Sequence, residues 1–120
     1  AQIVKGWVDD TGVSQEKVFD VAVADQRIAN TVTAKFPDVG NTVDVSKPSY
    51  TNTIGGTSIL AFWKDPEFRS DQSAFYYVRV LEIPTPRWST FDAVKLGTVP
   101  MEPATIQERA ITSSIWYRAY

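Results

Sequence analysis

The chain has 120 residues, with 12 basic and 14 acidic side chains, a net charge of −2, and neither cysteine nor histidine. This near balance of charge gives no support for a nucleic-acid surface or a polybasic membrane anchor, both of which need a clustered basic excess. Without cysteine and histidine, the usual zinc, copper and non-haem iron sites cannot form, and Ser-His-Asp or Cys-His catalysis is excluded within the chain. We therefore expect no nucleic acid, membrane or cofactor as a partner.

The first two segments predict a β-hairpin. Residues 2–8 and 17–24 have the alternation of strands, and Asp9-Asp10-Thr11-Gly12 between them is a turn by composition. A shift of the register by one residue would place Asp20 in the core. We therefore expect the pairing of these strands to be firmly specified.

The next part predicts a long loop and a second hairpin. Residues 25–41 are polar and interrupted by proline and glycine, so we expect a surface loop with at most one helical turn, and the region most prone to disorder. A short strand is expected at 42–45. Gly55-Gly56 separates the strand-like runs 49–54 and 57–63, which indicates a hairpin. Apolar residues at both parities predict that the second run is buried on both faces.

The clearest strand signal is the run from Ala74 to Pro86. Aromatic and aliphatic side chains fall on both of its faces, which is typical of a central strand covered on both sides. Pro84 and Pro86 cannot donate hydrogen bonds to a ladder and should end it.

One helical turn and one short helix are predicted in the connections, the turn at Asp65–Phe68 and the helix after it in the chain. Asp65-Pro-Glu-Phe68 fits an N-cap followed by proline at the first helical position. Residues 90–96 predict a helix that ends at Gly97, with Ser89 and Asp92 spaced as in a capping box.

The closing segments complete a mainly β domain. Residues 106–110 and 113–117 predict two more strands after an extended linker at 99–103. About seven short strands separated by turn residues predict one domain over residues 1–120, an Ig-like antiparallel β-sandwich with one or two short helices in its connections. A small open β-barrel is the structural alternative.

Several segments, in order, resemble the C-terminal part of the domain-of-unknown-function family 3604. They extend over nearly the whole chain, and the longest of them is specific. The matching segments are Ile3-Val-Lys-Gly-Trp7, Glu16-Lys-Val-Phe-Asp20, Gly40-Asn-Thr-Val-Asp44, Tyr50-Thr-Asn-Thr-Ile-Gly55, Asp65-Pro-Glu-Phe68, Ala74 to Ala93, Ile106-Gln-Glu-Arg-Ala110 and Ser114-Ile-Trp-Tyr117. The chain departs from the family pattern at Ser113-Ser114, where Ser-Pro is usual, and at Ile111, where an aromatic residue is common.

The resemblance implies a bacterial parent several times longer, related to PHP-type metal-dependent phosphoesterases whose metal ligands lie upstream. This chain, which begins without methionine, would then be a C-terminal fragment with no catalytic residues of its own. The upstream catalytic domain would be its partner, and the parent would be periplasmic or secreted. A homodimer through an exposed apolar patch is the other expected assembly.

Six residues are candidates for an interface or ligand-binding surface: Arg79, Glu82, Arg87, Trp88, Asp92 and Trp116. Arg79 interrupts an apolar strand, which predicts either a pairing with a carboxylate such as Glu82 or Asp92, or a contact with an oxyanion. Arg87 beside Trp88 is a combination enriched at interfaces. The alternative places Trp88 in the core of a rigid crossover.

The sequence also leaves a metal site and a carbohydrate-binding site as alternatives. The acidic residues at Asp9-Asp10, Asp65 with Glu67, and Asp92 could bind a hard cation, but turn and cap chemistry explains them without a metal. Four Trp and five Tyr could form a sugar-stacking platform, so a free-standing glycan-binding sandwich is the alternative function. A small enzyme in its own right is the third hypothesis.

Overall fold

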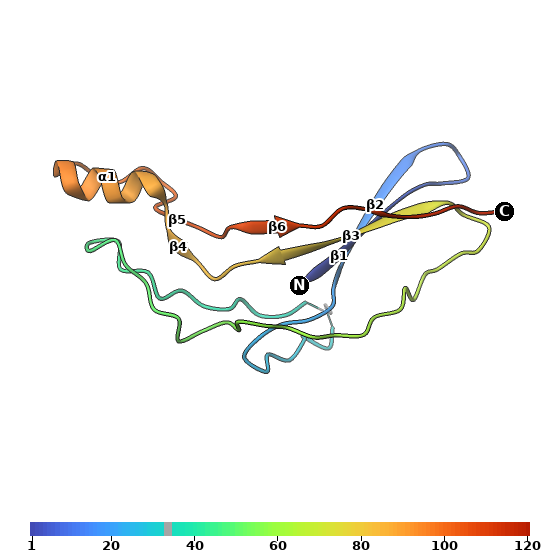
Figure 1. Ribbon diagram of the computed structural model, residues 1–120, viewed down its shortest axis with the longest axis horizontal. Coiled ribbons are helices and arrows are strands. Elements are labelled where there is room, and N and C mark those ends of the chain that lie inside the picture. Colours follow the sequence, from blue (N-terminus) through green and yellow to red (C-terminus); the bar gives the residue numbers. More distant parts are fainter. Residues whose placement is uncertain (33–34) are drawn as a thin grey trace. The chain divides into compact units, whose positions relative to one another are not determined.

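The computed structural model describes residues 1–32 and 35–120 (Figure 1). The chain forms two compact units. The first, here called the sheet unit, contains Ala1–Val23, Ser58–Val80 and Ala110–Tyr120, and the second, the helix unit, contains Ala24–Thr57 and Leu81–Arg109. Within the described residues no helix has the length and apolar character needed to cross a membrane.

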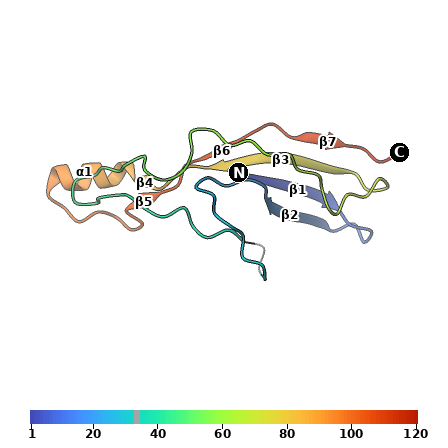
Figure 2. The same cartoon turned by 90° about the horizontal axis from the view of Figure 1, so that it is seen from below.

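The sheet unit is built on an antiparallel sheet with the strand order β2-β1-β3-β6, in which β7 also pairs with β3 (Figure 2). Its strands are β1 (Gln2–Val8), β2 (Ser14–Asp20), β3 (Ala74–Leu81), β6 (Arg109–Ile111) and β7 (Ile115–Tyr117). The hairpin of β1 and β2 is confirmed, although β2 lies earlier in the chain than predicted. The central position of β3 is confirmed as well, because β1 lies on one side of it and β6 with β7 on the other.

The side chain of Asp9 holds the turn between β1 and β2. Its Oδ1 accepts hydrogen bonds from the N–H groups of Thr11 and Val13, each at 3.0 Å, and its Oδ2 accepts one from the amide of Gln15 at 2.7 Å. Gly12 takes a positive φ of 84°, as its place in the turn predicts. These hydrogen bonds, led by the one from the Thr11 hydroxyl, lower the pKa of Asp9 to about 2.

We expect Asp9 to titrate near this value in an NMR titration of the folded chain, rather than at the ordinary 3.8. Because the folded-state pKa is the lower one, the turn contributes stability above about pH 4 and loses it as the pH falls toward 2. Asp9→Ala should remove this acid-sensitive contribution, whereas Asp10→Ala should leave it in place. A midpoint near 3.8 for Asp9 would show that the turn hydrogen bonds do not persist in solution.

One face of the sheet is covered by residues 58–72, here called the covering segment. Trp63 lies over this face, with its ring centroid 5.1 Å from that of Phe19 and 6.4 Å from that of Tyr76. The hairpin predicted around Gly55-Gly56 is wrong, because neither of its arms joins a ladder. Instead, side-chain packing of Trp63 holds the segment on the sheet, and Leu60, at the other parity, is 99% exposed.

The opposite face of the sheet carries aromatic side chains that remain partly open. The ring of Phe75 lies on Gly6, so close that a Cβ at Gly6 would lie 2.3 Å from a ring carbon. The centroid of the same ring lies 5.2 Å from that of Trp116. Trp116 and Val8 on this face are exposed, and Val80 on the covered face is 41% exposed. The prediction that β3 is covered on both sides is therefore wrong.

The helix unit contains the two-stranded ribbon of β4 (Thr85–Pro86) and β5 (Thr105–Ile106) and the helix α1 (Trp88–Leu96). Gly97 ends the helix with a φ of 67°, as predicted. The predicted capping box is wrong, because the helix begins at Trp88 and Arg87 is the N-cap residue, without a side-chain cap. Ser89 lies buried inside the first turn instead.

The remaining loops contain turns where short elements were predicted. An isolated bridge between Asp44 and Ser49 takes the place of the strand expected at 42–45. At Asp65 a single turn forms, as predicted, with the Phe68 N–H donating to the Asp65 carbonyl at 3.4 Å. Of the loop predicted at 25–41, the described residues contain neither helix nor strand, and residues 33 and 34 lie outside the described part. The predicted class, mainly β with antiparallel pairing in the manner of a β-sandwich, is confirmed.

Candidate partner-binding surfaces

Helix α1 buries its small residues and exposes its large apolar ones. Ser89, Thr90 and Ala93 point into the helix unit, and Thr90, at 0% exposure, donates its hydroxyl to the carbonyl of Ala104 at 2.7 Å. The exposed part of the helix, here called the outward face of α1, has Trp88 and Phe91 opposite the buried residues, with Val94 and Leu96 on its two flanks. A surface helix normally turns its apolar stripe toward the core. In α1 the large apolar residues are exposed instead, which makes its outward face a candidate surface for a partner.

The small residues explain why the helix turns this way. Ala93 on the helix and Ala104 before β5 are both buried, and side chains of this size let backbones approach closely. Ala104 also accepts a hydrogen bond from the N–H of Arg87 at 3.0 Å, beside the one from Thr90. Trp88 and Phe91 are too large for this contact and are directed outward.

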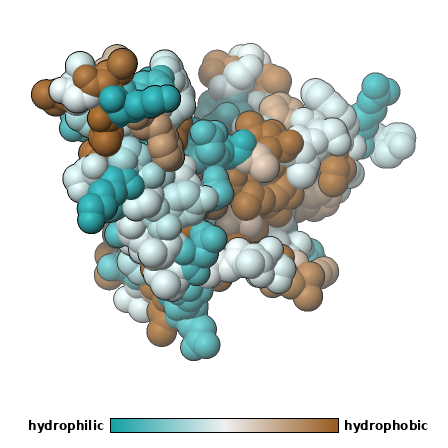
Figure 3. All heavy atoms as spheres, turned by 60° about the vertical axis from the view of Figure 1, so that its left-hand side comes forward, coloured by the Kyte–Doolittle hydropathy of each residue, from teal (hydrophilic) through white to brown (hydrophobic). Residues whose placement is uncertain are grey.

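The chain exposes more surface than a compact protein of its size. Its solvent-accessible surface is 8950 Å². A compact monomer of this size is expected to expose about 6,500 Å², and two separate compact bodies of half the size about 7,800 Å². The accessible surface of the chain thus exceeds even the area expected for two separate compact bodies. Apolar side chains open at the surface are visible in Figure 3.

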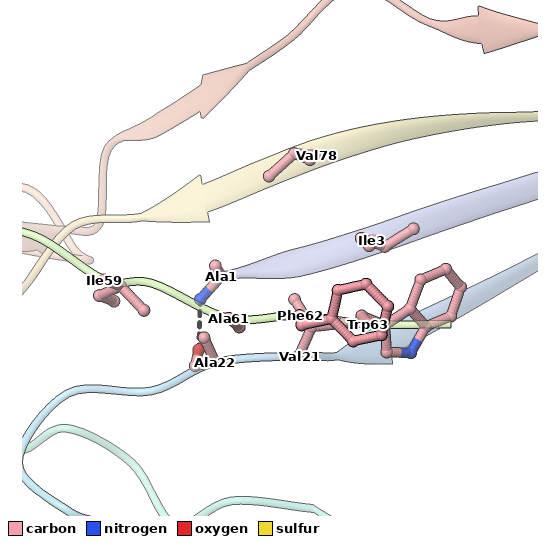
Figure 4. A pocket seen from close by; sticks show the side chains of 9 residues that line it. All are labelled: Ala1, Ile3, Val21, Ala22, Ile59, Ala61, Phe62, Trp63 and Val78. Atoms are coloured by element: carbon pink, nitrogen blue, oxygen red, sulfur yellow. Dashed lines mark hydrogen bonds between the residues drawn. The ribbon is translucent and has the colours of Figure 1, made fainter. Parts of the chain in front are cut away.

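Two apolar grooves lie on the covered face of the sheet unit. The first, with a volume of about 390 Å³, is lined by residues of β1 and β3, the residues after β2 and the covering segment (Figure 4). The second, of about 400 Å³, extends between the covering segment and β7 and is lined by Phe68, Tyr76 and Ile115 among others. Ile3, Trp63 and Val78 line both grooves, so Trp63 stands between them.

A buried ion pair fixes the covering segment to the sheet next to the second groove. Lys5 donates to the carboxylate of Asp65 at 2.6 Å and to the carbonyl of Glu67 at 2.9 Å, and the hydroxyl of Tyr76 donates to the same carboxylate oxygen at 2.8 Å. The Lys5 ammonium lies 5.3 Å from the ring centroid of Trp7, a cation–π distance. Because every one of these groups has a partner inside the unit, the cluster is structural.

The pKa values of the two acidic groups in this cluster, Asp65 and Tyr76, are shifted in opposite directions. Burial alone would raise the pKa of Asp65, but the hydrogen bonds from Lys5, the Glu67 N–H and Tyr76 together hold it below its ordinary value. Burial, with the hydrogen bond to the Asp65 carboxylate, raises the pKa of Tyr76. The carboxylate and the neutral phenol are thus the favoured forms at neutral pH. Sequence reasoning assigned Asp65 to an N-cap or a hard cation and overlooked Lys5, whose signal is a lysine on the same strand face as Ile3 and Trp7.

The structure separates the six predicted interface residues into two groups. Arg79 donates to the amide oxygen of Gln2 at 2.6 and 2.9 Å, in place of the predicted carboxylate Glu82 or Asp92. Gln2 in turn donates to Asp20 at 2.7 Å. Arg79 and Trp116 lie on the open face of the sheet. Arg79 is thus linked to a carboxylate, that of Asp20, through the side chain of Gln2.

The other four predicted residues belong to the helix unit. Arg87, Trp88 and Asp92 meet around the first turns of α1, and Trp88, at 72% exposure, is not the core residue of the alternative interpretation. Glu82 is exposed, and its N–H donates to the carbonyl of Glu108 at 2.9 Å. Sequence reasoning missed Phe91, although a helical wheel over residues 88–96 places it away from Thr90 and Ala93. It also missed Leu96, which is exposed at the end of the helix although the wheel places it near Ser89.

The acidic residues considered for a hard cation are dispersed. Asp9 is engaged in the hairpin turn and Asp65 in the buried ion pair, while Asp92 is exposed on α1. Over residues 1–32 and 35–120, no three or more side chains of the metal-binding types gather in one place. A metal ion of the kind implied by the resemblance therefore finds no donor set in this part of the chain.

Comparison with family models matches residues 1–119 to a family described as "Protein of unknown function (DUF3604)". The chain belongs to this family. No curated protein and no solved structure matches the chain. The DUF3604 match includes both units, so the outward face of α1 and the grooves beside Trp63 lie within the matched residues.

Proposed function

We propose that this DUF3604 domain is a non-catalytic accessory domain that packs against the rest of a larger bacterial protein. The resemblance to PHP-type phosphoesterases makes that protein a metal-dependent hydrolase of phosphoesters. The outward face of α1 carries the proposal, because covering the exposed Trp88 and Phe91 would remove a large apolar area from water.

The size of this face supports a specific contact. Covering one large apolar side chain contributes about 1.5–3 kcal/mol, and a few tryptophan and phenylalanine residues commonly dominate an interface. Trp88 and Phe91 lie on either side of Lys95 on this face, and Asp92 lies next to Trp88. Aromatic side chains are enriched at the centres of protein–protein interfaces, where a few charged ones accompany them.

In this proposal the metal ligands belong to the upstream part of the protein. The chain supplies no histidine, and its carboxylates are dispersed. The role of the domain is then to bury apolar surface of the larger protein and to hold that protein in its active arrangement.

The test mixes this chain with the separately produced remainder of the larger protein and measures association by titration calorimetry. We expect Trp88→Ser combined with Phe91→Ser to weaken association at least about thirtyfold, since truncating interface hot spots costs about 2 kcal/mol or more. The folded chain alone should be little affected, because both side chains are exposed.

The matched control is Ile28→Ser combined with Val32→Ser, which removes two exposed apolar residues from the other segment of the helix unit. This control should bind like the unchanged chain. Failure of the unchanged chain to associate would refute the proposal, and equal losses in both variants would remove α1 from the interface. If the chain forms a homodimer and does not bind the larger protein, the partner at this face would be a second copy of the chain.

A further inference from the structure

The hydrogen-bond register of β3 determines which backbone groups of β7 are directed outward. Val78 uses both of its backbone polar groups toward Thr112: its carbonyl accepts from the Thr112 N–H and its N–H donates to the Thr112 hydroxyl, each at 3.0 Å. Backbone groups alternate in direction along a strand, so those of Tyr76 also face β7. Ile115, the partner of Tyr76, therefore faces β3, and the N–H and C=O of Trp116 point away from the sheet.

The side chains along this edge are apolar. Residues 110–118, here called the β7 edge, include Ile111, Ile115 and Trp116, all exposed, with Ile115 at 74%. In the described part of the chain β7 pairs with β3 alone. Natural sheet edges are usually protected by charge, short length or a cover.

The other edge of the same sheet shows that protection. On β2, Glu16 and Asp20 are exposed, and Lys17 forms an ion pair with Glu67 of the covering segment. The two edges of one sheet thus differ in chemistry: β2 has acidic side chains beside its exposed Val18, whereas Ile115 and Trp116 on β7 have no acidic side chain next to them. That difference identifies the β7 edge as the one suited to strand addition.

The second groove lies directly beside this edge. Thr112, Ile115 and Tyr117 line the groove and belong to the edge, and Ile115 shares the sheet face of Tyr76. A strand added along β7 would direct every second side chain to that face, over the groove. In strand addition, main-chain hydrogen bonds supply affinity and pockets for alternate side chains supply specificity. Edge and groove together provide both.

We propose that the β7 edge receives an extended strand from the larger protein, whose alternate large apolar side chains enter the second groove. The inference rests on the proposed function and names the chemistry of the partner. Residues 110–120 contain Arg118 and no carboxylate, so the incoming strand carries acidic rather than basic residues next to it. A second copy is disfavoured as the occupant, because its own edge has no acidic side chain to pair with Arg118.

The test uses this chain with a synthetic eight-residue peptide of alternating leucine and threonine that has glutamate at both ends. Hydrogen–deuterium exchange resolved to single amides is measured with and without millimolar peptide. We expect exchange of the Trp116 amide to slow at least about tenfold on binding, because this N–H gains an acceptor. The amides of β2 should exchange as before.

Three matched comparisons separate strand addition from unspecific adsorption. The same peptide with every second amide N-methylated on its pairing edge should lose binding, whereas methylation of the opposite edge should not. A lysine-ended peptide, or the variant Arg118→Glu with the glutamate-ended one, should bind several-fold more weakly. Lys64→Glu makes the same charge change on the covering segment, away from the edge, and should bind normally.

Several results would overturn the proposal: no binding at millimolar peptide, protection on β2 instead, or equal binding of both N-methylated peptides. Concentration-dependent dimerisation that protects Trp116 would assign the edge to a second copy. In the complex with the larger protein, association without protection of Trp116 would refute the strand while leaving the accessory role intact. Absence of that complex would instead count against the accessory role itself.

Discussion

Replacing Asp65 with alanine is expected to lower the free energy of unfolding by about 3–5 kcal/mol, the usual cost of leaving one member of a buried ion pair alone. Lys5 is 3% exposed and keeps only the Glu67 carbonyl of its two hydrogen-bond acceptors when the carboxylate is removed. The same change takes the acceptor from the Tyr76 hydroxyl. The covering segment then loses its polar attachment to the sheet.

Urea denaturation followed by tryptophan fluorescence measures this loss. Asp71→Ala is the matched control, because it removes one carboxylate from an exposed pair with Arg69 and should cost less than about 1 kcal/mol. Lys5→Met combined with Asp65→Leu should be more stable than Asp65→Ala, since neither charge is then left unpaired. Equal stability of Asp65→Ala and the Asp71 control would show that the pair is solvated in solution.

The same carboxylate gives the stability of the sheet unit an acid limit. The pKa of Asp65 is held below its ordinary 3.8 in the folded state. A group with a lowered folded-state pKa contributes stability above its unfolded value, and this contribution is lost as the pH falls through the folded one. Acid unfolding should therefore begin below about pH 4 in the unchanged chain, and this dependence should weaken in the double variant with Met and Leu.

Local chemistry made the first hairpin and the end of α1 predictable. The turn at residues 9–12 uses side-chain acceptors that act within a few residues, and Gly97 needs only its own backbone conformation. The Gly55-Gly56 signal is equally local, but there the chain continues over the sheet because Trp63 packs against Phe19 and Tyr76. Such long-range packing overrides a turn signal and cannot be read from neighbouring residues.

The candidate surfaces were predictable only in part, for the same reason. Trp88 and Trp116 stand out in the sequence and are exposed in the structure. The direction of α1, however, depends on the bond from Thr90 to Ala104, which lies after the end of the helix. Likewise, Lys5 pairs with a carboxylate 60 residues away in the sequence, so the partner of this lysine cannot be predicted from its own strand.

Gly55→Ala is expected to cost about 2–5 kcal/mol, because two independent penalties act at this position. Gly55 has a φ of 78°, and the left-handed region costs a residue with a side chain about 1–2 kcal/mol. A Cβ there would also meet the Cγ2 of Ile83 at 2.5 Å, and overpacking of this kind costs about 1–3 kcal/mol. The Gly55 N–H donates to the carboxylate of Asp25 at 2.7 Å, which prevents the backbone from moving away without losing that bond.

Gly12→Ala separates the two penalties in the same denaturation experiment. Gly12 has a φ of 84°, but a Cβ at this position would meet no atom within 4 Å, so only the conformational cost of about 1–2 kcal/mol should appear. Ile83→Ala should cost less in the Gly55→Ala background than in the unchanged chain, because it removes the contact that the new Cβ would make. Equal losses at Gly12 and Gly55, together with additive effects of the Ile83 change, would mean that Ile83 does not pack against Gly55 in solution. The Gly55 backbone would then be positioned by its hydrogen bond to Asp25 and not by packing against Ile83.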